Sequence, residues 1–166
     1  VQDRVESLFR IGLHGPAPQG FSKKLSEGDF RRHREFIFDN SGKVRYIDYL
    51  KDESFDMPVP ERIFDPLSAF FYLRSLEMAV GKSIFVPVFD DKKVWDVEVK
   101  VLKKEKVNTP FGKKETLLIK PLMQSEGIFS RKGDILIWLT DDKDKIPVSM
   151  RSEIVFGGIT AVLIRR

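Results

Sequence analysis

The chain has 166 residues, of which 42% are hydrophobic and 33% charged, a composition typical of one globular domain rather than of a disordered segment. Its 29 basic and 25 acidic residues leave a net charge of +4, which is weak support for a polyanionic partner. The absence of cysteine excludes disulfides and thiol chemistry, and no apolar run approaches the roughly 20 residues that a membrane-spanning helix needs.

Alternating apolar and polar residues predict β-strands along most of the chain. Segment 12–20, with two prolines, predicts a loop, and segment 51–64, also with two, predicts a connection into the element that follows. The sequence Asp-Asn-Ser-Gly at 39–42 is a strong turn signal and predicts a hairpin. The predicted strands cover 1–9, 21–27 (a short edge strand), 30–38, 43–50, 82–89, 93–107, 113–121, 135–140, 147–156 and 159–164.

The longest predicted strand, 93–107, has one apolar and one polar face. These faces are formed by Trp95, Val97, Val99 and Val101 and by Asp96, Glu98 and Lys100. The pattern is typical of a half-buried antiparallel strand. We expect this strand to be central in its sheet, and Trp95 and Trp138 to be mostly buried.

One segment, 65–81, is predicted to be helical. Asp65 suits the N-cap because its carboxylate accepts the free amide protons of the first turn, and Pro66 suits the first helical position. Gly81 predicts the C-terminal end, about four turns later. The helix between them is apolar almost all round, so it must be covered on more than one side.

Arg74 interrupts an apolar face of this helix, between Phe70 and Phe71 on one side and Met78 on the other. A buried, unpaired guanidinium is costly, so this side chain must reach water or a carboxylate. One interpretation is a structural ion pair, for which the carboxylates near in sequence are Asp56, Glu61 and Glu77. The other is a cation that faces a cavity and anchors an acidic ligand.

These elements predict one mainly β domain over residues 1–166. We expect an antiparallel, half-open or closed barrel-like sheet with one main helix packed on its concave face. The 14 phenylalanines would line the interior of such a fold. They would either form a dense core or leave an apolar cavity, and the sequence leaves both alternatives open.

Four strings of residues resemble a known family: DPLSAFFYLR at 65–74, KVLKKEKVNTPFGKKETLLIKP at 100–121, GIFSRKGDILIWLTDDKDKIPV at 127–148 and GGITAVL at 157–163. Together they resemble the domain-of-unknown-function family 3108, found in exported proteins of Gram-negative bacteria. The resemblance implies a periplasmic or outer-membrane-associated location and an antiparallel barrel-like fold, and it implies little about activity. Members of that family carry a signal peptide and further strands before the position of Val1, so we expect this chain to lack both.

Three aspartates at 141, 142 and 144 offer oxygen ligands for calcium. The segment lacks the glycine and the distal glutamate of an EF-hand loop, and two lysines lie among the carboxylates. We therefore expect a solvated hairpin tip there, and no metal or other cofactor.

A Ser-His-Asp site would require Ser68 and Asp65 to meet His14 or His33, which are distant in sequence. The place of Ser68 in the first helical turn favours capping instead. The basic run 31–34 divides its charge between two faces of a strand, and no aromatic platform accompanies it, so we expect no nucleic-acid partner.

The expected function is non-enzymatic. We expect an envelope domain that binds a lipid or other amphiphile, or an envelope protein partner, in a groove beside the helix. The alternative is a hydrolase that acts on envelope polysaccharide or lipid. The candidate ligand-binding residues are Asp65, Ser68, Phe70, Phe71, Arg74 and Trp138.

Overall fold

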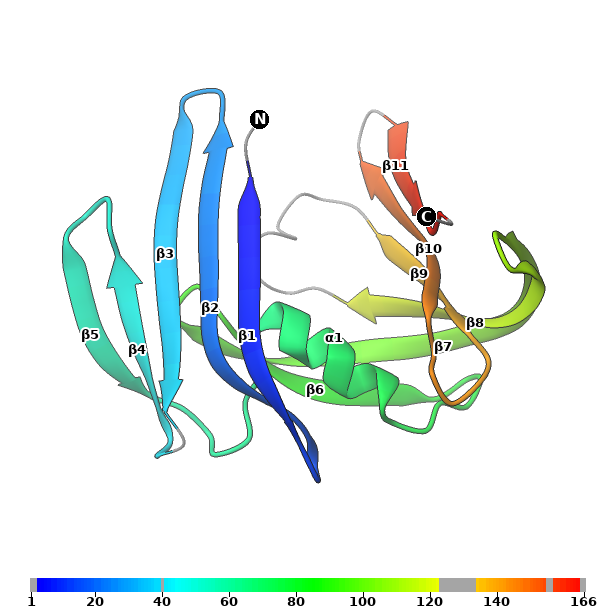
Figure 1. Cartoon of the computed structure of the whole chain (residues 1–166), viewed down its shortest axis with the longest axis horizontal. Helices are drawn as coiled ribbons and strands as arrows, with labels where there is room; N and C mark the ends of the chain where they lie inside the picture. Colours follow the sequence, from blue (N-terminus) through cyan, green and yellow to red (C-terminus); the bar gives the residue numbers. More distant parts are fainter. Residues whose placement is uncertain (1–2, 40, 123–133, 155–156, 165–166) are drawn as a thin grey trace. The chain divides into compact units, whose positions relative to one another are not determined.

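The computed structural model describes residues 3–39, 41–122, 134–154 and 157–164 (Figure 1). Three sequence predictions fall partly outside these ranges: the first two residues of strand 1–9, position 40 of the predicted turn, and the last two residues of strand 147–156. No helix in the described ranges has the length and apolarity that crossing a bilayer requires.

The described chain is mainly β-structure with one helix, so the predicted mainly β fold is confirmed. The strands form two antiparallel sheets, of order β1-β2-β3-β4-β5 and β11-β10-β9-β8-β7-β6, and neither closes into a barrel over the described residues. The elements are β1 (Arg4–Gly12), β2 (Gly15–Glu27), β3 (Phe30–Asp39), β4 (Lys43–Asp48), β5 (Glu53–Pro58), α1 (Pro66–Arg74), β6 (Ser83–Asp90), β7 (Lys93–Thr109), β8 (Gly112–Leu122), β9 (Ile135–Thr140), β10 (Pro147–Ile154) and β11 (Gly157–Val162).

The chain divides into two compact units. The first comprises Val1–Tyr72 and Pro87–Trp95, and the second comprises Leu73–Val86 and Asp96–Arg166. The division passes through α1, β6 and β7, so each of these three elements contributes to both units.

In the first unit, each of the strands β1 to β5 pairs with the next along the chain. Successive strand residues point to opposite faces, so one face of the sheet collects the aromatic core. Phe21, Phe36 and Tyr46 are almost fully buried there. The ring of Phe36 meets that of Phe89 edge-on, with centroids 5.6 Å apart, an arrangement that stabilises beyond the area buried.

The predicted loop 12–20 is wrong, because only Leu13 and His14 form a turn and β2 already begins at Gly15. Pro16 pairs with Ile11 and Pro18 with Phe9 on β1, whereas pairing to β3 starts only at Gly20. Proline has no N–H to donate, and it is tolerated here because this stretch of β2 has a partner on one side only.

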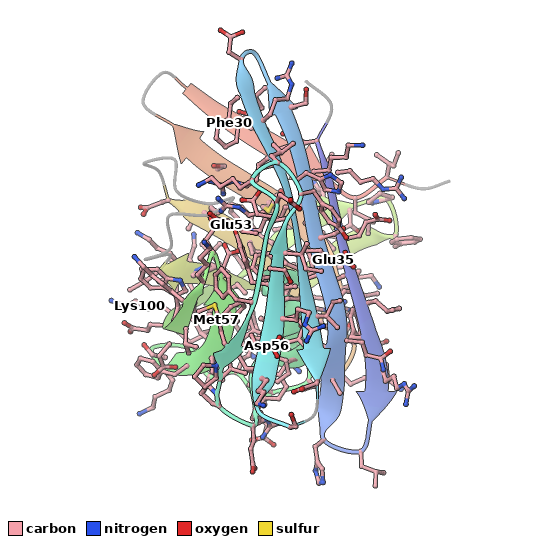
Figure 2. All side chains as sticks on the ribbon, turned by 90° about the vertical axis from the view of Figure 1, so that its left-hand side faces the viewer. Phe30, Glu35, Glu53, Asp56, Met57 and Lys100 are labelled. Carbon is pink, nitrogen blue, oxygen red and sulfur yellow. The ribbon has the colours of Figure 1, made fainter. Side chains whose placement is uncertain are left out.

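The predicted connection 51–64 contains a strand, β5, that the sequence patterns did not predict. It pairs with β4 alone and is exposed along most of its length, so its apolar periodicity is weak. Figure 2 shows Asp56 and Met57 on this strand. Asp56 accepts a hydrogen bond from Arg45 of β4 at 2.8 Å, a cross-strand pair of the kind that stabilises an exposed edge.

The helix is shorter than predicted: α1 begins at Pro66, as expected, but ends at Arg74 rather than before Gly81. Gly81 does adopt a positive φ of 80°, but its N–H donates to the carbonyl of Val101 on β7 at 2.8 Å. The N–H of Val101 returns to the carbonyl of Lys82 at 3.0 Å. Gly81 and Lys82 therefore have main-chain partners on β7 rather than within a longer helix.

In the second unit, β7 has strands on both sides, which agrees with its expected central position. Its apolar face is buried as predicted at Val97, Val99 and Val101. Trp95, which precedes these valines on β7 and belongs to the first unit, and Trp138 on β9 are only partly buried, so the prediction that both are mostly buried is wrong. The core of the unit is completed by Leu117, Leu118 and Ile119 of β8 and by Ile137 and Leu139 of β9.

Candidate functional site

A pocket of about 390 Å³ lies at one end of the first sheet, within the first unit. It is lined by three segments: the β1–β2 turn with the start of β2, the β3–β4 turn, and residues 59–64 that lead into α1. Antiparallel pairing places these connections at the same end of the sheet, the lower end in Figure 1. The volume falls within the range of small-molecule sites.

The floor of this pocket is apolar. Pro16 and Pro18 of β2 are buried, and so is Phe38 of β3. Ile63 and Phe64 close the floor from the segment before α1, with exposed fractions of 6% and 2%. An apolar ligand group would thus meet apolar side chains on several sides.

The rim of the pocket is polar and carries both signs of charge. Arg62 is exposed, donates from Nη2 to the carbonyl of His14 at 3.0 Å, and stacks over the ring of Tyr72 at 4.6 Å. Glu61 and Asp39 supply carboxylates. Hydrogen bonds from Ser41 and Lys43 hold the pKa of Asp39 below its usual range, so this group is ionised at neutral pH.

Two close backbone approaches shape the pocket. The N–H of Val59 donates to the carbonyl of Gly42 at 2.9 Å, which joins the β3–β4 turn to the segment after β5. Gly42 has a φ of 78°, a conformation that suits glycine. Gly15, with a φ of 101°, lies so close to Tyr72 that an added Cβ would stand 3.2 Å from the ring.

None of the six residues predicted to bind a ligand lines this pocket. Asp65 and Ser68 are fully buried. The Asp65 carboxylate accepts hydrogen bonds from the N–H groups of Leu67 and Ser68, as expected of an N-cap. It also accepts from the hydroxyls of Ser68, at 2.6 Å, and of Ser7 on β1, at 2.9 Å. This pair therefore caps the helix and joins it to the sheet.

Phe70 is partly buried and Phe71 is 46% exposed. The ring of Phe71 packs against that of Phe9 on β1, with centroids 5.1 Å apart. The contact of Phe71 with Phe9 and the hydrogen bond of the N-cap Asp65 with Ser7 place the helix against β1.

Arg74 and Trp138 belong to the second unit. The guanidinium of Arg74 donates to the carbonyls of Lys145 and Asp144, each at 2.9 Å, in the turn between β9 and β10. The predicted partners of Arg74 were water, a carboxylate or an acidic ligand, and these main-chain carbonyls were not among them. Trp138 donates from its indole N–H to Glu105 of β7 at 2.8 Å.

The acidic segment 141–144 forms the turn between β9 and β10. Asp142 accepts hydrogen bonds from the Thr140 hydroxyl, at 2.8 Å, and from the N–H groups of Asp144 and Lys145. These bonds lower the pKa of Asp142. Over the described ranges, no group of His, Asp and Glu side chains is arranged to hold a metal ion.

The elements of a Ser-His-Asp site are only partly assembled. Ser68 bonds to Asp65, whereas His33 stacks on Tyr49 with ring centroids 4.4 Å apart. His14 lies exposed at the β1–β2 turn. In the part of the chain that the structure describes, no hydrogen bond joins either imidazole to Ser68.

A second notable feature of the first unit is a cluster of buried charges, which we call the ionic cluster. Lys23 of β2 has no exposed surface, and its ammonium pairs with Asp90 at the end of β6. Arg34 of β3 bonds to Asp91, at 2.8 Å, and to Asp48 of β4, at 2.9 Å. Arg32 reaches Asp91 at 2.8 Å, and the Tyr46 hydroxyl donates to Asp48 at 3.0 Å.

The electrostatics of the ionic cluster follow from its burial. Burial raises the pKa of Asp90 against the opposing attraction of Lys23, and burial with the Asp48 carboxylate raises the pKa of Tyr46 to about 12. Burial alone would raise the pKa of Asp48 too, but the hydrogen bonds from Arg34 and Tyr46 outweigh it and the pKa is lowered. The cluster has three cations and three carboxylates, so it is internally neutralised rather than open to a charged ligand.

The sequence did not predict the enclosed carboxylates of Asp90, at the end of β6, and of Asp91, in the turn between β6 and β7. The turn places Asp91 and Lys92 at positive φ, 45° and 69°. An Asp-Lys pair is unusual for such a hairpin turn, which favours Asn and Gly. This unusual residue pair is a local signal that the Asp91 side chain has a role beyond the turn.

Comparison with known proteins gives one match. The sequence model of the family described as Protein of unknown function (DUF3108) matches residues 1–164. No curated protein matches the chain, and no solved structure matches it.

Proposed function

This chain belongs to the family Protein of unknown function (DUF3108), and on that premise we propose that it is a non-enzymatic binding domain for an amphiphilic ligand. The observation that carries the proposal is the pocket of about 390 Å³, with its apolar floor and polar rim. Ligand sites combine an apolar lining with a few polar groups that orient the ligand. The pocket has both.

The ligand's apolar group would lie on Phe38, Ile63 and the two prolines of β2. Its polar head would then be at the rim, where Arg62 offers a planar cation that suits carboxylate and phosphate oxygens. The stack of Arg62 on Tyr72 and its bond to the His14 carbonyl orient the guanidinium in advance. Such preorganisation reduces the entropy that binding would otherwise cost.

We also propose that the domain works in the periplasm or at the outer membrane. The support is the resemblance to exported proteins of Gram-negative bacteria, which concerns the family rather than a feature of the pocket. Fractionation of cells that make the full-length natural protein, with a periplasmic and a cytoplasmic marker, tests this part. Recovery with the cytoplasmic marker would contradict it.

The binding proposal is tested by native mass spectrometry after incubation with a lipid extract. Val59, which lines the pocket, is replaced in Val59→Trp so that the indole fills the space. Val94→Trp is the matched control, because Val94 is 44% exposed in the same unit and does not line the pocket. We expect one-to-one lipid adducts on wild type and Val94→Trp, and at least tenfold fewer on Val59→Trp.

Two results would contradict the proposal. One is the absence of adducts on the wild-type protein, together with no displacement of a fluorescent fatty acid. The other is equal retention by Val59→Trp and Val94→Trp, with equal melting temperatures, because the ligand would then lie outside this pocket.

A further inference from the structure

The β1–β2 turn holds large aliphatic side chains in open solvent. Leu13 is fully exposed and Ile11 is 74% exposed. Leu13 and His14 form the two-residue turn between the paired glycines Gly12 and Gly15. Turns of this length favour Asn, Asp and Gly, which supply the backbone conformation or local hydrogen bonds. Leucine at the tip supplies neither, and its side chain is left in solvent.

Two exposed arginines belong to the same region as these aliphatic side chains. Arg10 is exposed and precedes Ile11 in β1. Arg62 is exposed and is held at the turn by its bond to the His14 carbonyl at 3.0 Å. Glu61 beside it keeps the local charge mixed. The turn thus combines exposed aliphatic side chains with neighbouring arginines, and guanidinium suits phosphate oxygens.

We propose that Ile11 and Leu13 insert into the surface of a lipid bilayer, with Arg10 and Arg62 at the level of the headgroup phosphates. A stable protein interface needs roughly 800 Å² from each partner and a complementary shape. Two side chains at the end of a hairpin do not offer that area. A bilayer needs no matching surface, because its acyl region accepts single aliphatic side chains wherever they enter.

The position of the turn gives this contact a consequence. Gly12, Leu13 and His14 also line the pocket, so a bilayer at the tip would face the pocket's rim. An amphiphile would then pass between membrane and pocket with little exposure of its apolar part to water. Only this consequence rests on the proposed function, whereas the insertion of the tip stands without it.

The test is co-sedimentation with large vesicles of phosphatidylcholine and phosphatidylglycerol. The test variant is Ile11→Ser/Leu13→Ser. The matched control is Leu50→Ser/Ile159→Ser, which removes a leucine and an isoleucine that are also exposed, by 57% and 66%, from other surfaces. We expect wild type and control to bind equally and the test variant to bind at least tenfold more weakly, with unchanged melting temperatures.

A second measurement locates the insertion. In Leu13→Trp, the new indole should shift its emission to shorter wavelength on vesicles and be quenched by brominated acyl chains, relative to Leu50→Trp. Val59→Trp should keep full vesicle binding, which separates this inference from the pocket proposal. The inference is overturned if wild type does not bind vesicles, if Ile11→Ser/Leu13→Ser binds as tightly as the control, or if the indole at position 13 is not quenched.

Discussion

Removing the buried cation at position 23 should destabilise the first unit strongly. In Lys23→Met the aliphatic stem is retained, so packing against Phe21 changes little and the ammonium alone is lost. Asp90 is then left with 1% of its surface exposed and without its cation. One of its carboxylate oxygens, Oδ2, already lacks a hydrogen-bond partner among the described residues, which makes the loss of the other oxygen's partner more costly.

The magnitude follows from the burial of both partners. Truncating one member of a buried pair costs about 3–5 kcal/mol, because the remaining charge is uncompensated in a medium of low polarity. Replacing both members by apolar residues is often neutral. Lys23→Met/Asp90→Leu should therefore recover most of the loss and lie within about 1–2 kcal/mol of wild type.

Urea unfolding of the wild type, both single variants and the double variant at pH 7 measures the coupling. We also expect the loss in Lys23→Met to shrink as the pH falls, because protonation of Asp90 removes the unpaired charge. A loss below about 1 kcal/mol in Lys23→Met would refute the reasoning, since a fully enclosed pair cannot be so weakly coupled. A double variant no more stable than the worse single variant would refute it equally.

Three further predictions concern other groups. The pKa of Tyr46 is raised to about 12 in the folded protein, so its contribution to the free energy of unfolding is fully present below pH 10, and up to about 3 kcal/mol of it is lost as the pH rises to 12. In urea unfolding, Tyr46→Phe should therefore lose less stability at alkaline pH than the wild type. Equal losses would contradict the buried hydroxyl. Asp65→Ala should cost about 2 kcal/mol or more in thermal unfolding, because it removes the helix cap and the acceptor of two serine hydroxyls, whereas the exposed control Asp96→Ala should cost little. Trp95→Phe should cost less than about 1 kcal/mol in urea, since the buried indole N–H has no hydrogen-bond partner in the described ranges and its loss removes an unsatisfied donor; a loss above about 2 kcal/mol would show that the N–H is satisfied.

Local patterns in the sequence were sufficient for most of the secondary structure. Alternation located ten of the eleven described strands in outline because strand periodicity is carried by adjacent residues. Asp65 and Pro66 located the start of the helix, because capping depends on hydrogen bonds within a few residues. The buried face of β7 followed from its valines for the same reason. These features are determined by neighbours in the chain.

Features that depend on which strands become neighbours were decided by the tertiary structure alone. Pro16 and Pro18 belong to a strand because β3 does not reach them, and Gly81 bonds to Val101 of β7 instead of ending the helix. The burial of Lys23 depends on Asp90 at the end of β6, which is 67 residues away. The pocket likewise needs three separate segments to meet at one end of the sheet. No local pattern encodes such meetings, since burial and charge pairing are set by contacts between residues far apart in the sequence.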